Sequence, residues 1–126
     1  MGTATTWTEA GFAAWSAKAA GATLSPDRVR FGALGAHEVE IAVECCAVCH
    51  SDLHLLDGDW SSARFPLVPG HEVVGRIVAL GAAVRATEDV AVGARVGVGW
   101  QCGACFRCDA CVRGEVHVCS GGKRRT

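Results

Sequence analysis

A run of β-branched and apolar residues occupies residues 69–81, whose sequence is PGHEVVGRIVALG. Because this short run is bounded by Gly70 and Gly81, it predicts a buried strand over Glu72–Leu80. Gly75 lies inside the strand, where a glycine marks a bulge or the close approach of another backbone. The segment also carries a histidine followed by a glutamate, so polar chemistry is predicted at the point where a buried strand begins.

Similar short segments lie on both sides of this strand. The stretch Glu38–Cys45 alternates strictly, and the face predicted to be buried carries Val39, Ile41, Val43 and Cys45. Further strands are predicted at Phe12–Ala17, Val29–Phe31 and Arg95–Val98. A short helix is predicted at Ser51–Leu56, with Gly58 ending it. About six short strands with little helix favour a mainly β fold, a small barrel or sandwich.

Composition narrows the classes of function. The chain has 126 residues, of which 50% are hydrophobic, so residues 1–126 are expected to form one domain with its own core. A net charge of −1 argues against nucleic acid or an anionic membrane as the main partner. No apolar run is as long as a membrane span, and the N-terminus does not resemble a secretory signal. We therefore expect a cytoplasmic protein whose thiols are reduced.

A cysteine-rich lobe is predicted at residues 102–119, which contain five of the eight cysteines. Four of them follow the pattern Cys-x2-Cys-x2-Cys-x7-Cys, namely Cys105, Cys108, Cys111 and Cys119. Four thiolates at this spacing complete a tetrahedral shell around Zn²⁺ and leave no position open for a substrate. The lobe has too few apolar residues to fold by burial alone, so the metal is expected to supply much of its folding free energy.

Three other interpretations of the lobe remain open. An iron–sulfur cluster is disfavoured because the bacterial ferredoxin pattern has a shorter last spacer and a following proline. Disulfide pairing is disfavoured by the expected reducing compartment. A redox switch remains an alternative, because zinc thiolates can be oxidised. The other cysteines, Cys45, Cys46 and Cys102, are interpreted as spare thiols.

A second polar cluster follows the strand at Glu38–Cys45, where residues 49–54 are CHSDLH. Cys49 and His71 come from separate elements, and a Cys and a His of this kind form a partial ligand set of a catalytic zinc. A single cysteine or histidine is, however, usually packed in a core without a metal. The spacing alone leaves both interpretations of Cys49 and His71 open.

At these residues the sequence strongly resembles the zinc-dependent medium-chain alcohol dehydrogenases. The fixed positions of the family's zinc signature are all present, as Gly70, His71, Glu72, Gly75, Gly81 and Val84. Residues 49–52 match the segment that carries the family's first ligand, and the four cysteines of the lobe match its structural-zinc loop. The match runs from about Phe12 to Cys119 and is most similar to the cinnamyl-alcohol-dehydrogenase and aldehyde-reductase branch. It implies a GroES-like barrel with short helices and a cysteine-rich zinc lobe.

The resemblance also implies a role for each polar residue. Cys49 and His71 would bind the catalytic zinc, Glu72 would approach that metal during ligand exchange, and Asp52 would orient His71 from behind. Ser51 and His54 would pass the proton of the substrate hydroxyl toward solvent. His50 would contact the pyrophosphate of the cofactor, and Trp60 would form a wall of the substrate pocket. The cofactors implied are two zinc ions together with NAD or NADP.

The departures from the family pattern are equally specific. The family's third catalytic ligand is a cysteine downstream of the lobe, and neither it nor the Rossmann domain is present in residues 1–126. NAD(P) is therefore expected to bind only with the missing domain, and these residues alone are expected to be inactive. The full-length protein would act on a small alcohol or aldehyde, with a homo-oligomer as the family-typical state. The alternatives are a non-catalytic zinc-binding module with thiol redox sensitivity and a zinc ribbon that binds nucleic acid, the latter weakened by the net charge.

Overall fold

The computed structural model describes residues 11–122 and 124–125. Its regular elements are, in chain order, β1 (Phe12–Ser16), β2 (Ser25–Val29), β3 (Val39–Ala47), α2 (His50–Asp57), β4 (Glu72–Leu80), β5 (Arg95–Val98), β6 (Gln101–Gly103), α3 (Asp109–Val112), the 3-10 helix η1 (Val116–Val118) and β7 (Arg124–Arg125). Strands dominate and the helices are short, so the mainly β prediction is confirmed. None of the helices in the described segments has the length and apolar character that crossing a membrane requires.

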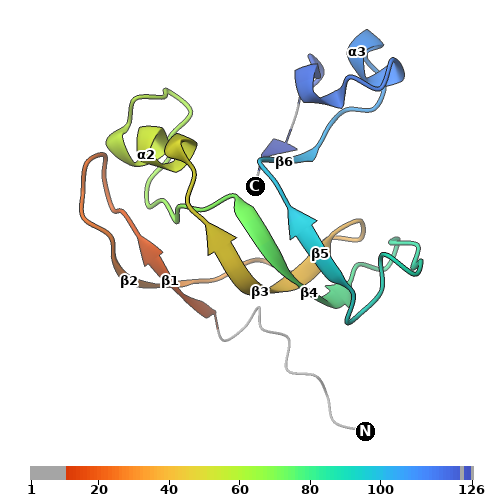
Figure 1. Ribbon diagram of the computed structural model, residues 1–126, viewed down its shortest axis with the longest axis horizontal. Coiled ribbons are helices and arrows are strands. Elements are labelled where there is room, and N and C mark those ends of the chain that lie inside the picture. The colour runs from red at the N-terminus through yellow and green to blue at the C-terminus, as the bar shows by residue number, and fades with distance from the viewer. Residues whose placement is uncertain (1–10, 123, 126) are drawn as a thin grey trace, which may run out of the picture.

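The segment at residues 69–81 forms the middle of the central sheet. Strand β4 lies between β3 and β5 and is antiparallel to both (Figure 1). Gly75 is buried at the centre of β4, and a β-carbon there would collide with the carbonyl oxygen of Ala42 on β3. The predicted close approach at this glycine is therefore confirmed, and Ile77 of the same strand is only 2% exposed.

The predicted burial of one face of β3 was wrong. Val43 is 61% exposed and Cys45 is also exposed, although both lie in the strand as expected. The pairing of β3 with β4 shifts register between Glu40 and Ile41 and again between Val43 and Cys45, so the strict alternation of the sequence is not kept in the strand. β3 is also an edge strand, with a hydrogen-bonded neighbour in its sheet on one side only.

A hairpin of β1 and β2 forms a second, two-stranded sheet. The prediction of β1 is confirmed, whereas β2 begins earlier than predicted, at Ser25, and ends at Val29. Ala17, which follows β1, is fully buried and pairs with Leu67 through two backbone hydrogen bonds of 2.8 and 2.9 Å. The hairpin is thereby fixed to the segment that leads into β4.

Helix α2 begins and ends close to the predicted limits. Its last turn is closed by Gly58, whose φ of 78° is the left-handed conformation that glycine adopts without strain. Its N-cap is Cys49, which has extended backbone angles and is separated from the end of β3 by Val48 alone. The helix therefore places Cys49 at its N-terminus, facing the start of β4.

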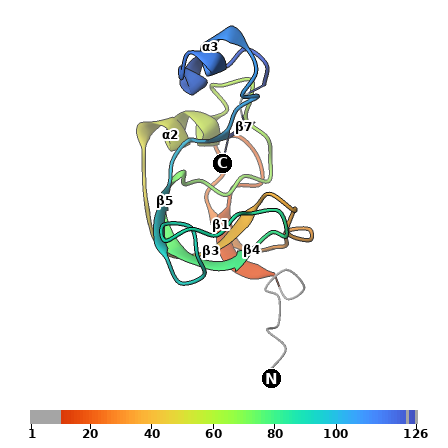
Figure 2. The same ribbon diagram turned by 90° about the vertical axis from the view of Figure 1, so that its right-hand side faces the viewer.

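The cysteine-rich lobe projects away from the central sheet, beyond the end of β5 (Figures 1 and 2). It contains α3 and η1, and β6 at its base pairs with β7. Both views place α2 and the lobe toward the same end of the molecule. The residues predicted for the two metal sites thus lie toward this end, and the rest of the sheet and the hairpin form the other.

Candidate metal centre

The first cluster brings together three potential ligands from two elements. Cys49 at the start of α2 and His71 and Glu72 at the start of β4 have ligand atoms that all lie within 4.8 Å of one another. His71 is 7% exposed, Cys49 is half-buried and Glu72 is exposed, so the cluster opens to solvent on the Glu72 side. A thiol, an imidazole and a carboxylate are a mixed ligand set of the kind that zinc accepts.

Asp52 joins the two elements of this cluster. Its carboxylate is 2% exposed and accepts hydrogen bonds from the Cys49 N–H (3.0 Å), the Gly70 N–H (3.0 Å) and Nδ1 of His71 (2.9 Å). Since Nδ1 of His71 is hydrogen-bonded to Asp52, Nε2 of His71 is the nitrogen left to bind a metal. Asp52 thus contacts His71 on the side away from the cluster, as the resemblance implied. Its hydrogen bonds with the backbone of Cys49 and Gly70 were not predicted.

The electrostatics of Asp52 favour its ionised form. Burial by itself would raise the pKa of this carboxyl group. The hydrogen bonds from Cys49, His71 and Gly70 outweigh that effect, and the net result is a lowered pKa. An ionised Asp52 can accept a hydrogen bond from the Nδ1–H group of His71, which holds the imidazole in one tautomer.

Helix α2 presents the residues predicted to handle the proton and the cofactor. Nδ1 of His54 lies 2.8 Å from the carboxylate of Asp59, and its ring stacks on Trp60 with centroids 5.3 Å apart. His50 is exposed and touches His54 edge-on at 5.0 Å. Ser51 lies between them on the same helix and is half-buried.

Trp100 is a member of the site that the sequence did not point to. Its ring meets His71 nearly perpendicularly, at 79° with centroids 4.6 Å apart, and it meets Trp60 at 83° and 5.9 Å. Trp100 follows β5 and precedes the lobe, far along the chain from both partners. No local motif links these three residues, so only the fold could reveal their contact.

The second cluster is formed by the four cysteines that the spacing singled out, Cys105, Cys108, Cys111 and Cys119. The sulfur atoms of Cys105 and Cys111 are 3.9 Å apart, and those of Cys108 and Cys119 are 4.0 Å apart. A disulfide bond would be ~2.05 Å long. Four sulfurs at ~2.3 Å from a tetrahedral zinc ion lie ~3.8 Å from one another, so the observed spacing fits a single metal ion.

Backbone N–H groups point at these sulfurs and favour negative charge on them. The N–H of Cys108 donates to Sγ of Cys105, and the N–H of Cys105 donates to Sγ of Cys119, both at 3.4 Å. N–H groups of Cys111 and Ser120 lower the pKa of the Cys108 thiol to about 5. Burial, together with the neighbouring thiols, raises the pKa of Cys111 to about 12. The cluster is thus built for thiolates, and its full ionisation requires a bound cation.

The three cysteines interpreted as spare thiols lie outside both clusters. Cys45, Cys46 and Cys102 are exposed and belong to neither set of ligand atoms. Cys46 packs against the backbone near the first cluster, because a β-carbon at Gly70 would lie 2.5 Å from its sulfur. This contact and a φ of +113° explain why residue 70 is glycine.

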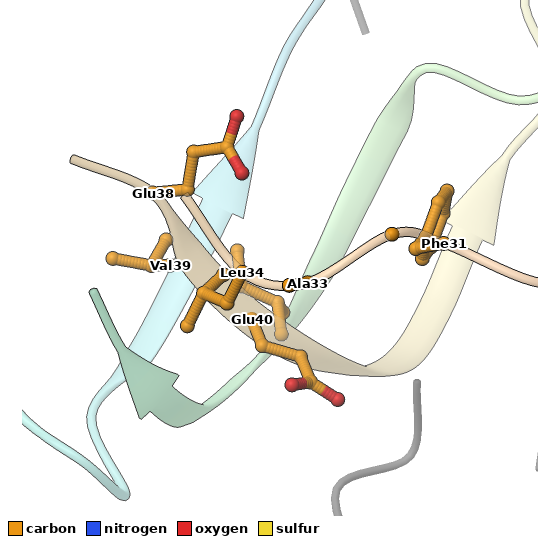
Figure 3. A pocket seen from close by; sticks show the side chains of 8 residues that line it. Phe31, Ala33, Leu34, Glu38, Val39 and Glu40 are labelled. Carbon is orange, nitrogen blue, oxygen red and sulfur yellow. The ribbon is translucent and has the colours of Figure 1, made fainter. Parts of the chain in front are cut away.

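A separate pocket of about 300 Å³ lies at the other end of β3 (Figure 3). Its walls include Phe31, Leu34 and Val39, with the carboxylates of Glu38 and Glu40 nearby. None of the residues predicted for the site lines this pocket. The candidate chemistry is therefore located at the two clusters and not in this cavity.

Comparison with known proteins gives consistent results. Residues 35–125 match the family model described as the alcohol dehydrogenase GroES-like domain. The aldehyde reductase AdhA of Synechocystis is 49% identical over 75 residues, which are 60% of this chain and 22% of that protein. The chain therefore spans about a fifth of the length of this curated relative.

Solved structures resemble the fold over most of the described chain. The Helicobacter pylori protein CAD, determined with NADP(H), superposes with a TM-score of 0.77 at 27% identity, covering 86% of this chain and 30% of that one. A thermostable alcohol dehydrogenase from Pyrobaculum aerophilum, solved with cobalt and zinc, gives a TM-score of 0.75 at 25% identity and covers 88% of this chain and 34% of its own. The GroES-like fold expected from the sequence is thereby confirmed.

Proposed function

Because the chain belongs to the family defined by the alcohol dehydrogenase GroES-like domain, we propose that it is the metal-binding part of an NAD(P)-dependent dehydrogenase that interconverts primary alcohols and aldehydes. The observation that carries this proposal is the convergence of Cys49, His71 and Glu72 within 4.8 Å. His71 and Glu72 match the family's zinc signature, Cys49 matches the segment that carries the family's first ligand, and all three lie at the junction of α2 and β4. The named relative reduces aldehydes, and the structural relatives bind NADP(H) or zinc.

In the first cluster, Cys49 and His71 would hold a zinc ion, with Glu72 able to approach it. Zinc there would act as a Lewis acid that polarises the oxygen of the alcohol or carbonyl group. Asp52 holds Nδ1 of His71, so Nε2 is the nitrogen left to bind the metal. The exposed side at Glu72 leaves room for a substrate to enter.

The proton of the substrate hydroxyl would leave along α2. Ser51 would accept it, and His54 would exchange it with solvent. The side chain of His54 is 40% exposed and its Nδ1 lies 2.8 Å from the Asp59 carboxylate, so the ring is held in place within reach of water. His50, exposed at the first turn of α2, would contact the cofactor pyrophosphate, and Trp60 would form a wall for the substrate.

The lobe would hold a second zinc ion with a structural role. Four protein sulfurs leave no coordination position for a substrate. The metal would instead hold together α3 and η1, which have no buried residues of their own. The cofactor would be bound by a further part of the longer proteins to which the chain is similar, so residues 1–126 alone are expected to show no dehydrogenase turnover.

Metal content tests the proposal directly. The purified chain is expected to carry two zinc ions by elemental mass spectrometry. Cys49→Ser and Cys111→Ser should each remove one ion, and Cys45→Ser, which changes an exposed cysteine outside both clusters, should remove none. A single zinc ion that is lost in Cys111→Ser and retained in Cys49→Ser would refute the catalytic site and favour the non-catalytic zinc-binding module.

A further inference from the structure

We propose that Trp100 is a positioning residue that fixes the imidazole plane of His71 and couples this ligand to the cysteine-rich lobe. The inference rests on the proposed function, because it concerns the metal ligand His71. It assigns to Trp100 a role that is separate from any contact with substrate. The evidence is the geometry of the rings and the hydrogen bonds on either side of Trp100.

Asp52 alone cannot fix the imidazole. The hydrogen bond of 2.9 Å between Nδ1 of His71 and Asp52 sets the direction of that nitrogen. It leaves the ring free to swing about the bond and so to turn Nε2 away from the cluster. A second contact on the ring is needed to remove this freedom, and His71 is only 7% exposed, so its neighbours can supply one.

The ring of Trp100 supplies that contact. The centroids of the two rings are 4.6 Å apart and their planes differ by 79°, which is the edge-to-face arrangement that aromatic pairs prefer. With Nδ1 held by Asp52 and the ring held by Trp100, His71 has one orientation. In that orientation the ligand atoms of Cys49, His71 and Glu72 all lie within 4.8 Å of one another.

Trp100 is itself held from two sides. Its ring meets Trp60 at 83° with centroids 5.9 Å apart, which braces it against the loop that follows α2. The next residue, Gln101, donates from Nε2 to the carbonyl oxygens of Gly103 (3.1 Å) and Val116 (2.9 Å), and so ties the backbone to the lobe. Of these two consecutive residues, Trp100 therefore contacts His71 of the first cluster and Gln101 contacts the backbone of the lobe.

The expected effect is large enough to measure. Removing a partner that orients a metal-binding histidine weakens metal affinity by about 10–100-fold. Since Asp52 remains in place, we expect the lower end for Trp100→Ala, about tenfold, at the first cluster. Phe keeps an aromatic edge at the same position, so Trp100→Phe should stay within about threefold of the unsubstituted chain.

The experiment uses the whole chain with one equivalent of zinc already bound in the lobe. Cobalt(II) is then titrated, and the thiolate-to-cobalt absorption of Cys49 reports the affinity of the first cluster. Before cobalt is added, the chemical shifts and nuclear Overhauser contacts of the His71 ring protons show whether the imidazole has one orientation or more than one. Trp15→Ala is the matched control, because Trp15 is 60% exposed and lies on β1.

Trp100→Ala is expected to lose about tenfold in cobalt affinity and to show a second orientation of the His71 ring, and Trp100→Phe should restore both. A Trp100→Ala chain with unchanged affinity and a single ring orientation would overturn the inference. If Trp100→Ala does not fold, Trp100→Leu, which keeps a large apolar side chain without a ring, takes its place. If the unsubstituted chain binds no cobalt beyond the lobe, the proposed metal site fails, and the measurement of the ring orientation still decides the role of Trp100.

Discussion

Asp52 offers the sharpest test of how the first cluster is held together. Substituting it with alanine leaves three donors without their acceptor, the N–H groups of Cys49 and Gly70 and Nδ1 of His71. The carboxylate is 2% exposed, so water cannot readily replace it. Asp52→Ala should therefore destabilise the fold even before any metal is considered.

The magnitude follows from the three lost bonds. Each buried donor left unsatisfied costs about 1–3 kcal/mol, and the gain from no longer burying a charge offsets part of the sum. We expect Asp52→Ala to lower the free energy of unfolding by about 3–5 kcal/mol. Asp52→Asn keeps an oxygen for Gly70 and His71 but turns an NH₂ toward the Cys49 N–H, so its cost should be about 1–2 kcal/mol.

The assay is chemical denaturation of the chain with zinc in the lobe, followed by circular dichroism. Asp59→Ala is the matched control, because Asp59 also bonds a histidine of the site but is exposed. Its cost should stay below about 1 kcal/mol. The reasoning is refuted if Asp52→Ala is no more destabilising than Asp59→Ala, since burial would then not determine how much these hydrogen bonds contribute to the free energy of unfolding.

Three other predictions concern the rest of the chain. Gly121→Ala would place a β-carbon 2.5 Å from Sγ of Cys105, so the zinc affinity of the lobe, measured by competition with a chelator, should fall about tenfold. Gly99→Ala is the control and should leave the zinc affinity unchanged, because a β-carbon there would meet open space. Hydrogen bonds lower the pKa of Asp27 from 3.8 to about 2, so the stability it contributes is present above pH 3.8 and is lost as the pH falls through about 2. The stability difference between the unsubstituted chain and Asp27→Asn should shrink over that range, and a difference that is constant from pH 5 to pH 2 would contradict the assignment. Glu44 bridges two exposed arginines across the sheet, so Glu44→Gln should cost less than about 1 kcal/mol in thermal unfolding, and a larger loss would show that the pair is shielded from solvent.

Local patterns were sufficient for the elements that carry the site. The strand at Glu72–Leu80, the strand at Arg95–Val98 and the helix ending at Gly58 were predicted from periodicity and glycine placement, and the structure contains all three. These features depend on residues close in sequence, where side-chain period and backbone preference act directly. The burial of β3 could not be predicted in this way, because it depends on what packs against the strand and on its register with β4.

The same division holds for the clusters. The four cysteines of the lobe are spaced so closely that their convergence in one cluster was predicted from the sequence alone, and the sulfur separations of 3.9 and 4.0 Å agree. The residues alone left the roles of Cys49 and His71 open, since nothing local brings a helix N-cap to the start of a distant strand. The resemblance to a known family supplied that link before the structure did.

The sequence by itself determined the mainly β fold, the lobe and the four candidate ligands in the lobe, because each depends on residue types at short and regular spacing. Only the tertiary structure revealed the triple hydrogen bonding of Asp52 and the contact of Trp100 with His71. Both join segments that are far apart along the chain, and their geometry exists only after the sheet, the helix and the lobe have packed together. The orientation of His71, on which the proposed chemistry depends, is therefore a property of the fold.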